Sequence, residues 1–153
     1  MTSPQPSNSH DSAAPCIRNA ERKDIPAIMK IIEPYIQQHI LIPRNAADLE
    51  KLIPHGFVSE DAGKVVGFAA LEIYSSKLAE VHCLAVREDY QQHGLGKQLV
   101  EACVERARDE QVFELLAITS SDSFLLSCGF DYSLPDQRRA LFLRTGSPRK
   151  QGD

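Results

Sequence analysis

The sequence lacks the features that mark several classes of protein. Among its 153 residues, no apolar run approaches the roughly 20 residues that a membrane-spanning helix needs. Its 17 basic residues are outnumbered by 21 acidic ones, so no broad positive field exists to attract nucleic acid or an anionic membrane surface. The four cysteines form no CxxC pair, which argues against a zinc site or a disulfide framework. We therefore expect no metal, no nucleic-acid partner and no membrane association.

Both ends of the chain are polar. Residues 1–15 are rich in Ser, Pro, Asn and His and lack the basic start and apolar centre of a secretory signal, so we expect a cytoplasmic protein. This segment and residues 145–153 bury too little apolar surface to offset the entropy of ordering them. Residues 16–144 suffice for one domain with a true core. We therefore predict a disordered N-terminal tail, one domain and a flexible C-terminal tail.

The hydrophobic pattern between the tails predicts an α/β domain with a mixed sheet. Asp24 is placed to cap a helix, Pro26 fits the first turn of that helix, and Pro34 predicts a kink or break in it. In chain order the predicted elements are a strand at 16–18, a helix that begins after Asp24, a short helix at 46–53, strands at 57–60 and 64–74, a strand at 78–86, a helix at 95–108, a strand at 113–119, a short helix at 121–128 and a last strand at 139–144.

A glycine-containing loop joins the strand at 78–86 to the helix at 95–108. Gly94 and Gly96 allow the main chain to approach a ligand closely, and the N–H groups there point beside the positive end of the helix. Such a loop binds phosphate, although an ordinary tight turn with two glycines would show the same pattern. Two other phosphate loops are excluded, because a dinucleotide fingerprint needs glycine where Leu99 stands, and a P-loop needs glycine at Gln91 and a hydroxyl residue at Gln98.

The pattern Q-x-x-G-x-G, following Leu84-Ala85-Val86, resembles the pyrophosphate loop of the GNAT acetyltransferase superfamily. The resemblance implies the GNAT fold, in which a mixed, mostly antiparallel twisted sheet is splayed between its fourth and fifth strands and flanked by helices. It also implies acetyl-CoA as cosubstrate, with its pantetheine arm filling the splay. Leu84, Ala85 and Val86 would line the pantetheine, and the pyrophosphate would be held by Gln91, Gln92, His93, Gly94, Leu95, Gly96 and Lys97.

Segments 37–44 and 80–86 are similar to the acetyltransferase domain of the N-acetylglutamate synthases. By that resemblance Glu80 would be the general base, and the backbone N–H of Cys83 or Leu84 would polarise the thioester carbonyl. The tyrosine acid of many GNAT enzymes is replaced by Leu125, which points to a hydroxyl of Thr119 or Ser120, although helix capping explains Ser120 equally well. The residues implied for binding the acceptor are Leu41, Arg44, Arg138 and Arg144.

The resemblance implies acetylation of a small amino acid, glutamate first, and a place in arginine biosynthesis. We expect His82 and His93 to be incidental, and Cys83 has no evident partner that would make it a nucleophile. Three alternatives remain open: another small amine, a protein N-terminus, or a catalytically inactive acyl-CoA sensor. A homodimer is possible. Residues 1–15 are too short for the kinase-like domain that precedes many of these synthases, so we expect no arginine inhibition through such a domain unless a separate chain supplies it.

Overall fold

The computed structural model describes residues 13–133 and 141–146. In chain order its elements are β1 (Cys16–Asn19), the 3-10 helix η1 (Arg22–Asp24), α1 (Ile25–Gln37), α2 (Ala46–Leu52), η2 (Ile53–His55), β2 (Gly56–Asp61), β3 (Lys64–Ile73), β4 (Leu78–Val86), η3 (Glu88–Tyr90), α3 (Leu95–Asp109), β5 (Glu114–Ala117) and α4 (Ser123–Ser127). The chain divides into two compact units, one up to Ser120 and one from Ser121 onward. The first unit holds every element up to β5, and the second holds α4.

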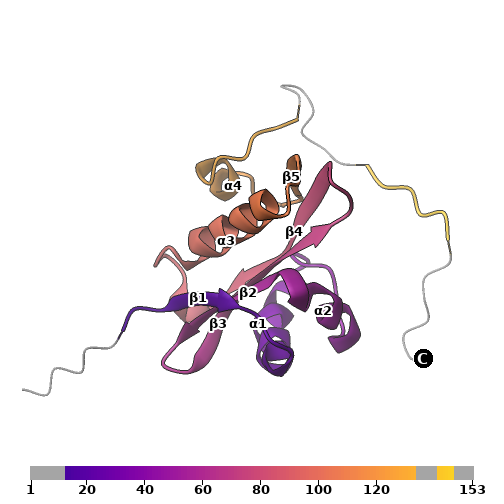
Figure 1. Cartoon of the computed structure of the whole chain (residues 1–153). Helices are drawn as coiled ribbons and strands as arrows, with labels where there is room; N and C mark the ends of the chain where they lie inside the picture. Colours follow the sequence, from indigo (N-terminus) through magenta and orange to yellow (C-terminus); the bar gives the residue numbers. More distant parts are fainter. Residues whose placement is uncertain (1–12, 134–140, 147–153) are drawn as a thin grey trace, which may run out of the picture. The chain divides into compact units, whose positions relative to one another are not determined.

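The five strands of the first unit form one sheet in the order β1-β2-β3-β4-β5 (Figure 1). Neighbouring strands are antiparallel except β4 and β5, which run parallel and are connected through α3. The β2–β3 hairpin turns at Ala62 and Gly63, whose φ values of 48° and 78° suit a two-residue turn between twisted strands. The predicted mixed, mostly antiparallel sheet flanked by helices is confirmed.

Side chains alternate between the two faces of this sheet, and helices cover both faces (Figure 1). Phe68 and Ala70 of β3 belong to a buried cluster with α1 and α2. On the other face Leu71 packs with Ala79 of β4 and Ala107 of α3. α1 contributes buried isoleucines at helical spacing, and each fully buried isoleucine stabilises the fold by about 1.5 to 3 kcal/mol. The strand order and these two layers bring the end of β4 next to the start of α3.

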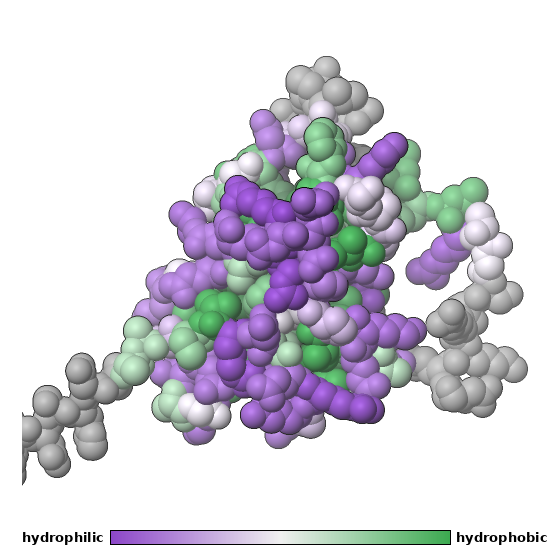
Figure 2. All heavy atoms as spheres, viewed as in Figure 1, coloured by the Kyte–Doolittle hydropathy of each residue, from purple (hydrophilic) through white to green (hydrophobic). Residues whose placement is uncertain are grey.

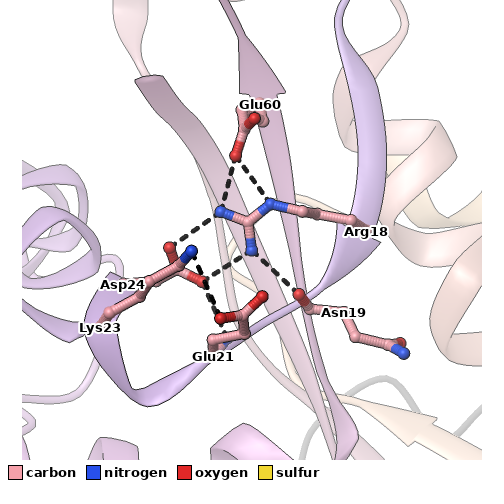
Figure 3. Close-up of polar contacts among 6 residues, drawn as sticks. All are labelled: Arg18, Asn19, Glu21, Lys23, Asp24 and Glu60. Atoms are coloured by element: carbon pink, nitrogen blue, oxygen red, sulfur yellow. Dashed lines mark hydrogen bonds and ion pairs between the residues drawn. The ribbon is translucent and has the colours of Figure 1, made fainter. Parts of the chain in front are cut away.

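A polar network at the start of the domain joins β1, η1 and β2 (Figure 3). The Arg18 guanidinium donates to both carboxylate oxygens of Asp24, at 2.8 and 2.9 Å, and to Glu60 at 2.7 Å. Asp24 also accepts the Glu21 backbone N–H at 2.8 Å. Asp24 precedes α1 as predicted, but its side chain makes no capping bond to that helix. The capping role expected of this side chain is wrong, because Arg18 and the 3-10 turn already occupy its oxygens.

The predicted break at Pro34 is also wrong, because α1 runs on to Gln37. Pro34 is exposed in the last turn of the helix, where water can bind the carbonyl group that loses its N–H partner. The helix ends where the N–H groups of Ile40 and Leu41 return to the Tyr35 carbonyl, at 2.9 and 3.2 Å. The chain then leads into α2, which the sequence predicts one residue longer.

In the second unit, α4 ends before Gly129, whose φ of 93° fits the predicted helix stop. Residues 141–144, the described part of the predicted last strand, form no strand and are exposed. That prediction is wrong for these residues, since β propensity produces a strand only where the backbone finds a pairing partner.

Polar residues cover most of the face seen in Figure 2, and apolar residues show only in small groups between them. The largest apolar side chains of the sheet, such as Phe68, lie inside. No helix within residues 13–133 and 141–146 is long and apolar enough to cross a membrane.

Candidate functional site

The edge of β4 that faces β5 is only half paired. β5 pairs with residues 78–81 of β4, and the last pair joins Val81 to Ala117. β4 continues to Val86, so within the described chain residues 82–86 have no strand beside them on this edge. An unpaired edge offers N–H and C=O groups to an extended ligand. This matches the splay between the fourth and fifth strands that the family resemblance implies.

β4 carries a bulge at the point where the splay begins. The pairing of Ala70 with His82 and of Phe68 with Ala85 leaves two residues of β4, Cys83 and Leu84, opposite a single residue of β3. Cys83 has a φ of 56°, a left-handed conformation that is rare for a residue with a side chain and concentrates at functional sites. A bulge takes the extra residue out of the ladder. The backbone here is thus turned away from regular strand geometry where a ligand would lie.

The loop after β4 ends in a helix start with free donors. Gly94 precedes α3 with a φ of 78°, a conformation that glycine adopts without strain. The first bond within the helix runs from the Gln98 N–H to the Gly94 carbonyl at 3.1 Å. The N–H groups of residues 95–97 therefore point out of the helix end, where they and the helix dipole favour an anion. This geometry suits the pyrophosphate of a coenzyme.

Tyr35 connects α1 with the end of β4 and with the loop. Its hydroxyl donates to the Val86 carbonyl and accepts the Gln91 side-chain amide. Sequence analysis predicts a site role for Val86 and Gln91 and misses Tyr35. The signal was present, because Tyr35 follows Ile28 and Ile32 at helical spacing on the buried side of α1.

Five polar side chains meet beside the bulge, on the face of the sheet covered by α1 and α2, and we name them the polar cluster: Arg44, Glu72, Tyr74, Glu80 and His82. The Tyr74 hydroxyl donates to Glu80 Oε2 at 2.5 Å and lies 3.2 Å from His82 Nε2. His82 Nε2 lies 2.8 Å from Glu72 Oε2 and 3.3 Å from Glu80 Oε2. Arg44 Nη2 lies 3.0 Å from His82 Nδ1.

Two members of the polar cluster are largely shielded from solvent. The Glu80 side chain is only 11% exposed and that of His82 12%, whereas Glu72 is 42% exposed. Burial, followed by the hydrogen bond to Glu80, raises the pKa of the Tyr74 phenol far above its ordinary value. Tyr74 therefore keeps its proton at neutral pH and donates a hydrogen bond to Glu80. Glu80 accepts this bond from a buried position, and a carboxylate is a group that can take a proton from a substrate.

Cys83 has the properties of a packed thiol. Burial raises the pKa of the Cys83 thiol, although the neighbouring Arg44 acts in the opposite direction. A thiol with a raised pKa is a poor nucleophile at neutral pH. The chemistry at this position then falls to the backbone, which the bulge reorients.

The other predicted site residues lie in different places. Leu41 packs against the hydrophobic core beside α1. Thr119 and Ser120 follow β5 by two and three residues and are exposed. Arg144 is exposed in the second unit, and Arg138 lies outside the described residues.

Glu72, Tyr74 and His82 are the residues of the cluster that sequence analysis misses or treats as incidental. Glu80 and His82 stand two apart on one strand and share a face, which the sequence does indicate. Glu72 lies directly opposite Glu80 because of the β3–β4 register, and the sequence alone does not set that register.

The chain is similar to a known family and to individual proteins of that kind. Residues 24–130 match the family described as the acetyltransferase (GNAT) family. An uncharacterized N-acetyltransferase of Chlorobaculum tepidum is 34% identical over 119 residues, covering 78% of this chain and 77% of that protein. An amino-acid acetyltransferase of Pasteurella multocida is 34% identical over 129 residues, covering 80% of this chain but only 29% of that protein.

A solved structure adds to these relatives. The N-acetylglutamate synthase of Neisseria gonorrhoeae, complexed with coenzyme A and N-acetyl-glutamate, is similar with a TM-score of 0.69 at 30% identity. The likeness covers 76% of this chain and 28% of that one. The chain therefore spans about three tenths of the Pasteurella and Neisseria proteins.

Proposed function

The chain belongs to the acetyltransferase (GNAT) family and is an acetyl-CoA-dependent N-acetyltransferase; within that activity we propose that its acceptor is a small amino acid, with glutamate favoured. The observation that carries the proposal is the polar cluster, in which a buried carboxylate, Glu80, and a guanidinium, Arg44, lie together beside the bulge of β4. The same proposal includes a role for the protein in arginine biosynthesis and a location in the cytoplasm.

Acetyl-CoA would lie along the unpaired edge of β4. The N–H groups at the start of α3 would hold its pyrophosphate, with the loop residues Gln91, Gln92 and His93 around it and Lys97 in the first turn. The pantetheine arm would pair with the edge at Leu84, Ala85 and Val86. Two features support this assignment: the edge stops pairing at Val81, and Gly94 places no side chain over the helix end.

The proposed reaction is direct transfer. The free amine attacks the thioester carbonyl carbon. Glu80 takes the proton of the amine, directly or through a water molecule between them. The backbone N–H of Cys83 or Leu84 holds the carbonyl oxygen. The C–S bond then breaks, and the departing thiolate takes a proton through a hydroxyl that regains one from water; Thr119 and Ser120 are the candidates for this relay. An amine near neutral pH is largely protonated, so the buried carboxylate of Glu80 is the group this step requires.

An amino-acid acceptor needs a cationic partner for its carboxylate, and Arg44 is the candidate within the cluster. Two relatives support this choice, since the Pasteurella protein is an amino-acid acetyltransferase and the Neisseria protein is an N-acetylglutamate synthase. Arg138 and Arg144 remain candidates for a second carboxylate.

A small amine without a carboxylate is the second candidate acceptor. The observation that favours it is charge, because the cluster carries two carboxylates, Glu72 and Glu80, and one guanidinium. Such a site attracts a cation.

One experiment separates these acceptors. We would measure kcat/KM for glutamate, glutamine and a polyamine in the wild type, in Arg44→Ala and in the control Arg22→Ala, which removes an exposed arginine paired with Glu50 on the surface. A glutamate enzyme should lose roughly tenfold or more in Arg44→Ala for glutamate, through a higher KM, because one charge-assisted contact is lost. A wild type that prefers the polyamine, or an equal loss for all three substrates in Arg44→Ala, would contradict the glutamate proposal.

A further inference from the structure

His82 stands between one positive and two negative side chains. Its Nδ1 faces the Arg44 guanidinium at 3.0 Å, and its Nε2 faces Glu72 at 2.8 Å and Glu80 at 3.3 Å. The ring is held in this orientation on both sides, and its side chain is only 12% exposed. The contacts occupy both ring nitrogens, so they determine where the imidazole carries its proton.

The hydrogen-bond donors assign the tautomer of His82. A guanidinium has donors and no acceptor, so Nδ1 must accept from Arg44 Nη2 and cannot itself carry a hydrogen. The ring proton then sits on Nε2, where the carboxylates of Glu72 and Glu80 accept it. A doubly protonated ring would place an N–H against the guanidinium. The contacts are therefore those that a neutral ring with its hydrogen on Nε2 would make.

A neutral ring at this point keeps opposite charges apart. Glu72 and Glu80 stand directly opposite each other on neighbouring strands, where like charges repel each other and a nearby cation would be attracted to both. A free guanidinium would close onto them in a bidentate pair. His82 occupies the space between, so Arg44 and the two carboxylates each contact the ring. In addition, Arg44 Nε is buried and has no hydrogen-bond partner among the described residues.

We propose that His82 is a positioning residue, which as a neutral imidazole holds Arg44 ready for the carboxylate of an α-amino acid and Glu72 and Glu80 ready for its ammonium group. The distance between the Arg44 guanidinium and the carboxylates of Glu72 and Glu80 is set by two hydrogen bonds and the width of an imidazole ring. The ammonium and carboxylate of an α-amino acid, with one hydrogen bond at each end, span a similar length. This inference rests on the proposed amino-acid acceptor and extends it by stating how the acceptor is recognised.

Two substitutions separate the contacts of the ring. In His82→Asn the amide oxygen replaces Nδ1 and can still accept from Arg44, whereas in His82→Gln the longer amide reaches the place of Nε2 and loses the contact with Arg44. We expect KM for the amino acid to rise roughly tenfold or more in His82→Gln and to stay within about threefold of the wild type in His82→Asn. In His82→Gln the KM for an amine without a carboxylate should stay within about threefold.

A matched control is available at His55, whose Nδ1 lies 3.1 Å from Arg106 Nη1. His55→Asn makes the same chemical change two strands away from β4, and we expect both KM values to stay at the wild-type level. If His82→Asn and His82→Gln raise KM equally, or if His82→Gln leaves KM unchanged, the positioning role is contradicted.

Nitrogen NMR of the imidazole rings tests the tautomer without any acceptor. We expect the signal that disappears in His82→Asn to report a protonated Nε2 and an unprotonated Nδ1 at neutral pH, and Arg44→Ala to shift it. A protonated Nδ1 would overturn the inference. The two proposals fail in different ways: a wild type that acetylates no amino acid contradicts the proposed function, and a wild type that does so with unchanged KM in His82→Gln contradicts only the role of His82.

Discussion

Replacing Glu80 by glutamine removes a proton acceptor and changes little else. The side chain is 11% exposed and accepts the Tyr74 hydroxyl at 2.5 Å, and the amide oxygen of glutamine can keep that contact. A general base contributes roughly 10²- to 10⁴-fold to a rate. This corresponds to about 3 to 5 kcal/mol of activation free energy at 1.36 kcal/mol per factor of ten. We therefore expect kcat to fall by at least about 10²-fold.

Stability and acetyl-CoA binding should not follow kcat. Glu80 lies directly opposite Glu72, so the substitution removes a repulsion between like charges worth about 0.2 to 1 kcal/mol. The Tm should stay level or rise slightly. Acetyl-CoA affinity should be nearly unchanged, because the proposed pyrophosphate site lies at the start of α3 and the proposed pantetheine site at residues 84–86.

The assay is thiol release at saturating acetyl-CoA, combined with calorimetry for acetyl-CoA binding and a thermal melt. Glu72→Gln is the matched control, since it removes the opposite carboxylate and a contact of His82 but leaves Glu80 in place. We expect Glu72→Gln to change KM for the acceptor, with kcat within about tenfold of the wild type. A Glu80→Gln enzyme with kcat within threefold of the wild type, or an equal loss of kcat in both variants, would refute Glu80 as the base.

Two further predictions concern the coenzyme site and the fold. Gly94→Val forces a branched side chain to a φ of 78° and should lower acetyl-CoA affinity at least tenfold by calorimetry. The control is Gly63→Val, which imposes the same φ in the β2–β3 turn and should keep the wild-type affinity. An equal loss of affinity in both variants would contradict the assignment of the loop. Arg18→Met leaves the buried Asp24 carboxylate without its main partner and should cost about 3 kcal/mol in urea unfolding. Arg18 lowers the folded-state pKa of Asp24, so this stability is present above the unfolded pKa of about 4 and is lost as pH falls below it. Above pH 5 the free energy of unfolding of the wild type should exceed that of Arg18→Met by the full amount, and this difference should become smaller in more acidic solution. A difference that stays constant down to pH 2 would contradict the pairing of Arg18 with Asp24.

The coenzyme side of the site follows from backbone features that a sequence displays. Gly94 after a strand and before an amphipathic helix predicts a helix start with free N–H groups, and the structure has that geometry. β4 was predicted with its observed bounds, Leu78–Val86, because an apolar run between turn residues is a strong local signal. The bulge at Cys83 was not predicted. It arises from the register against β3, a property of two strands together.

The acceptor side depends on side chains from three separate parts of the chain. Arg44 precedes α2, Glu72 and Tyr74 come from β3 and the residue after it, and Glu80 and His82 come from β4. Alternation within one strand predicts that Glu80 and His82 share a face, but it does not place Glu72 opposite Glu80. His82 is therefore expected to be incidental when β4 is considered alone, and it lies at the centre of the polar cluster once β3 is aligned.

The contrast between backbone features on the coenzyme side and side chains on the acceptor side explains why the family could be predicted from the sequence and the acceptor is harder to assign. The coenzyme site that we propose consists largely of backbone groups, and these leave a signature of glycines and strand ends in the sequence. The acceptor is read by charged side chains whose effect depends on their neighbours. In the role we propose for it, Arg44 binds a carboxylate only while His82, which contacts both Arg44 and Glu72, keeps the guanidinium from the glutamates. A sequence that keeps Arg44 but replaces His82 by a residue that cannot accept a hydrogen bond should therefore lose amino-acid recognition while still binding acetyl-CoA.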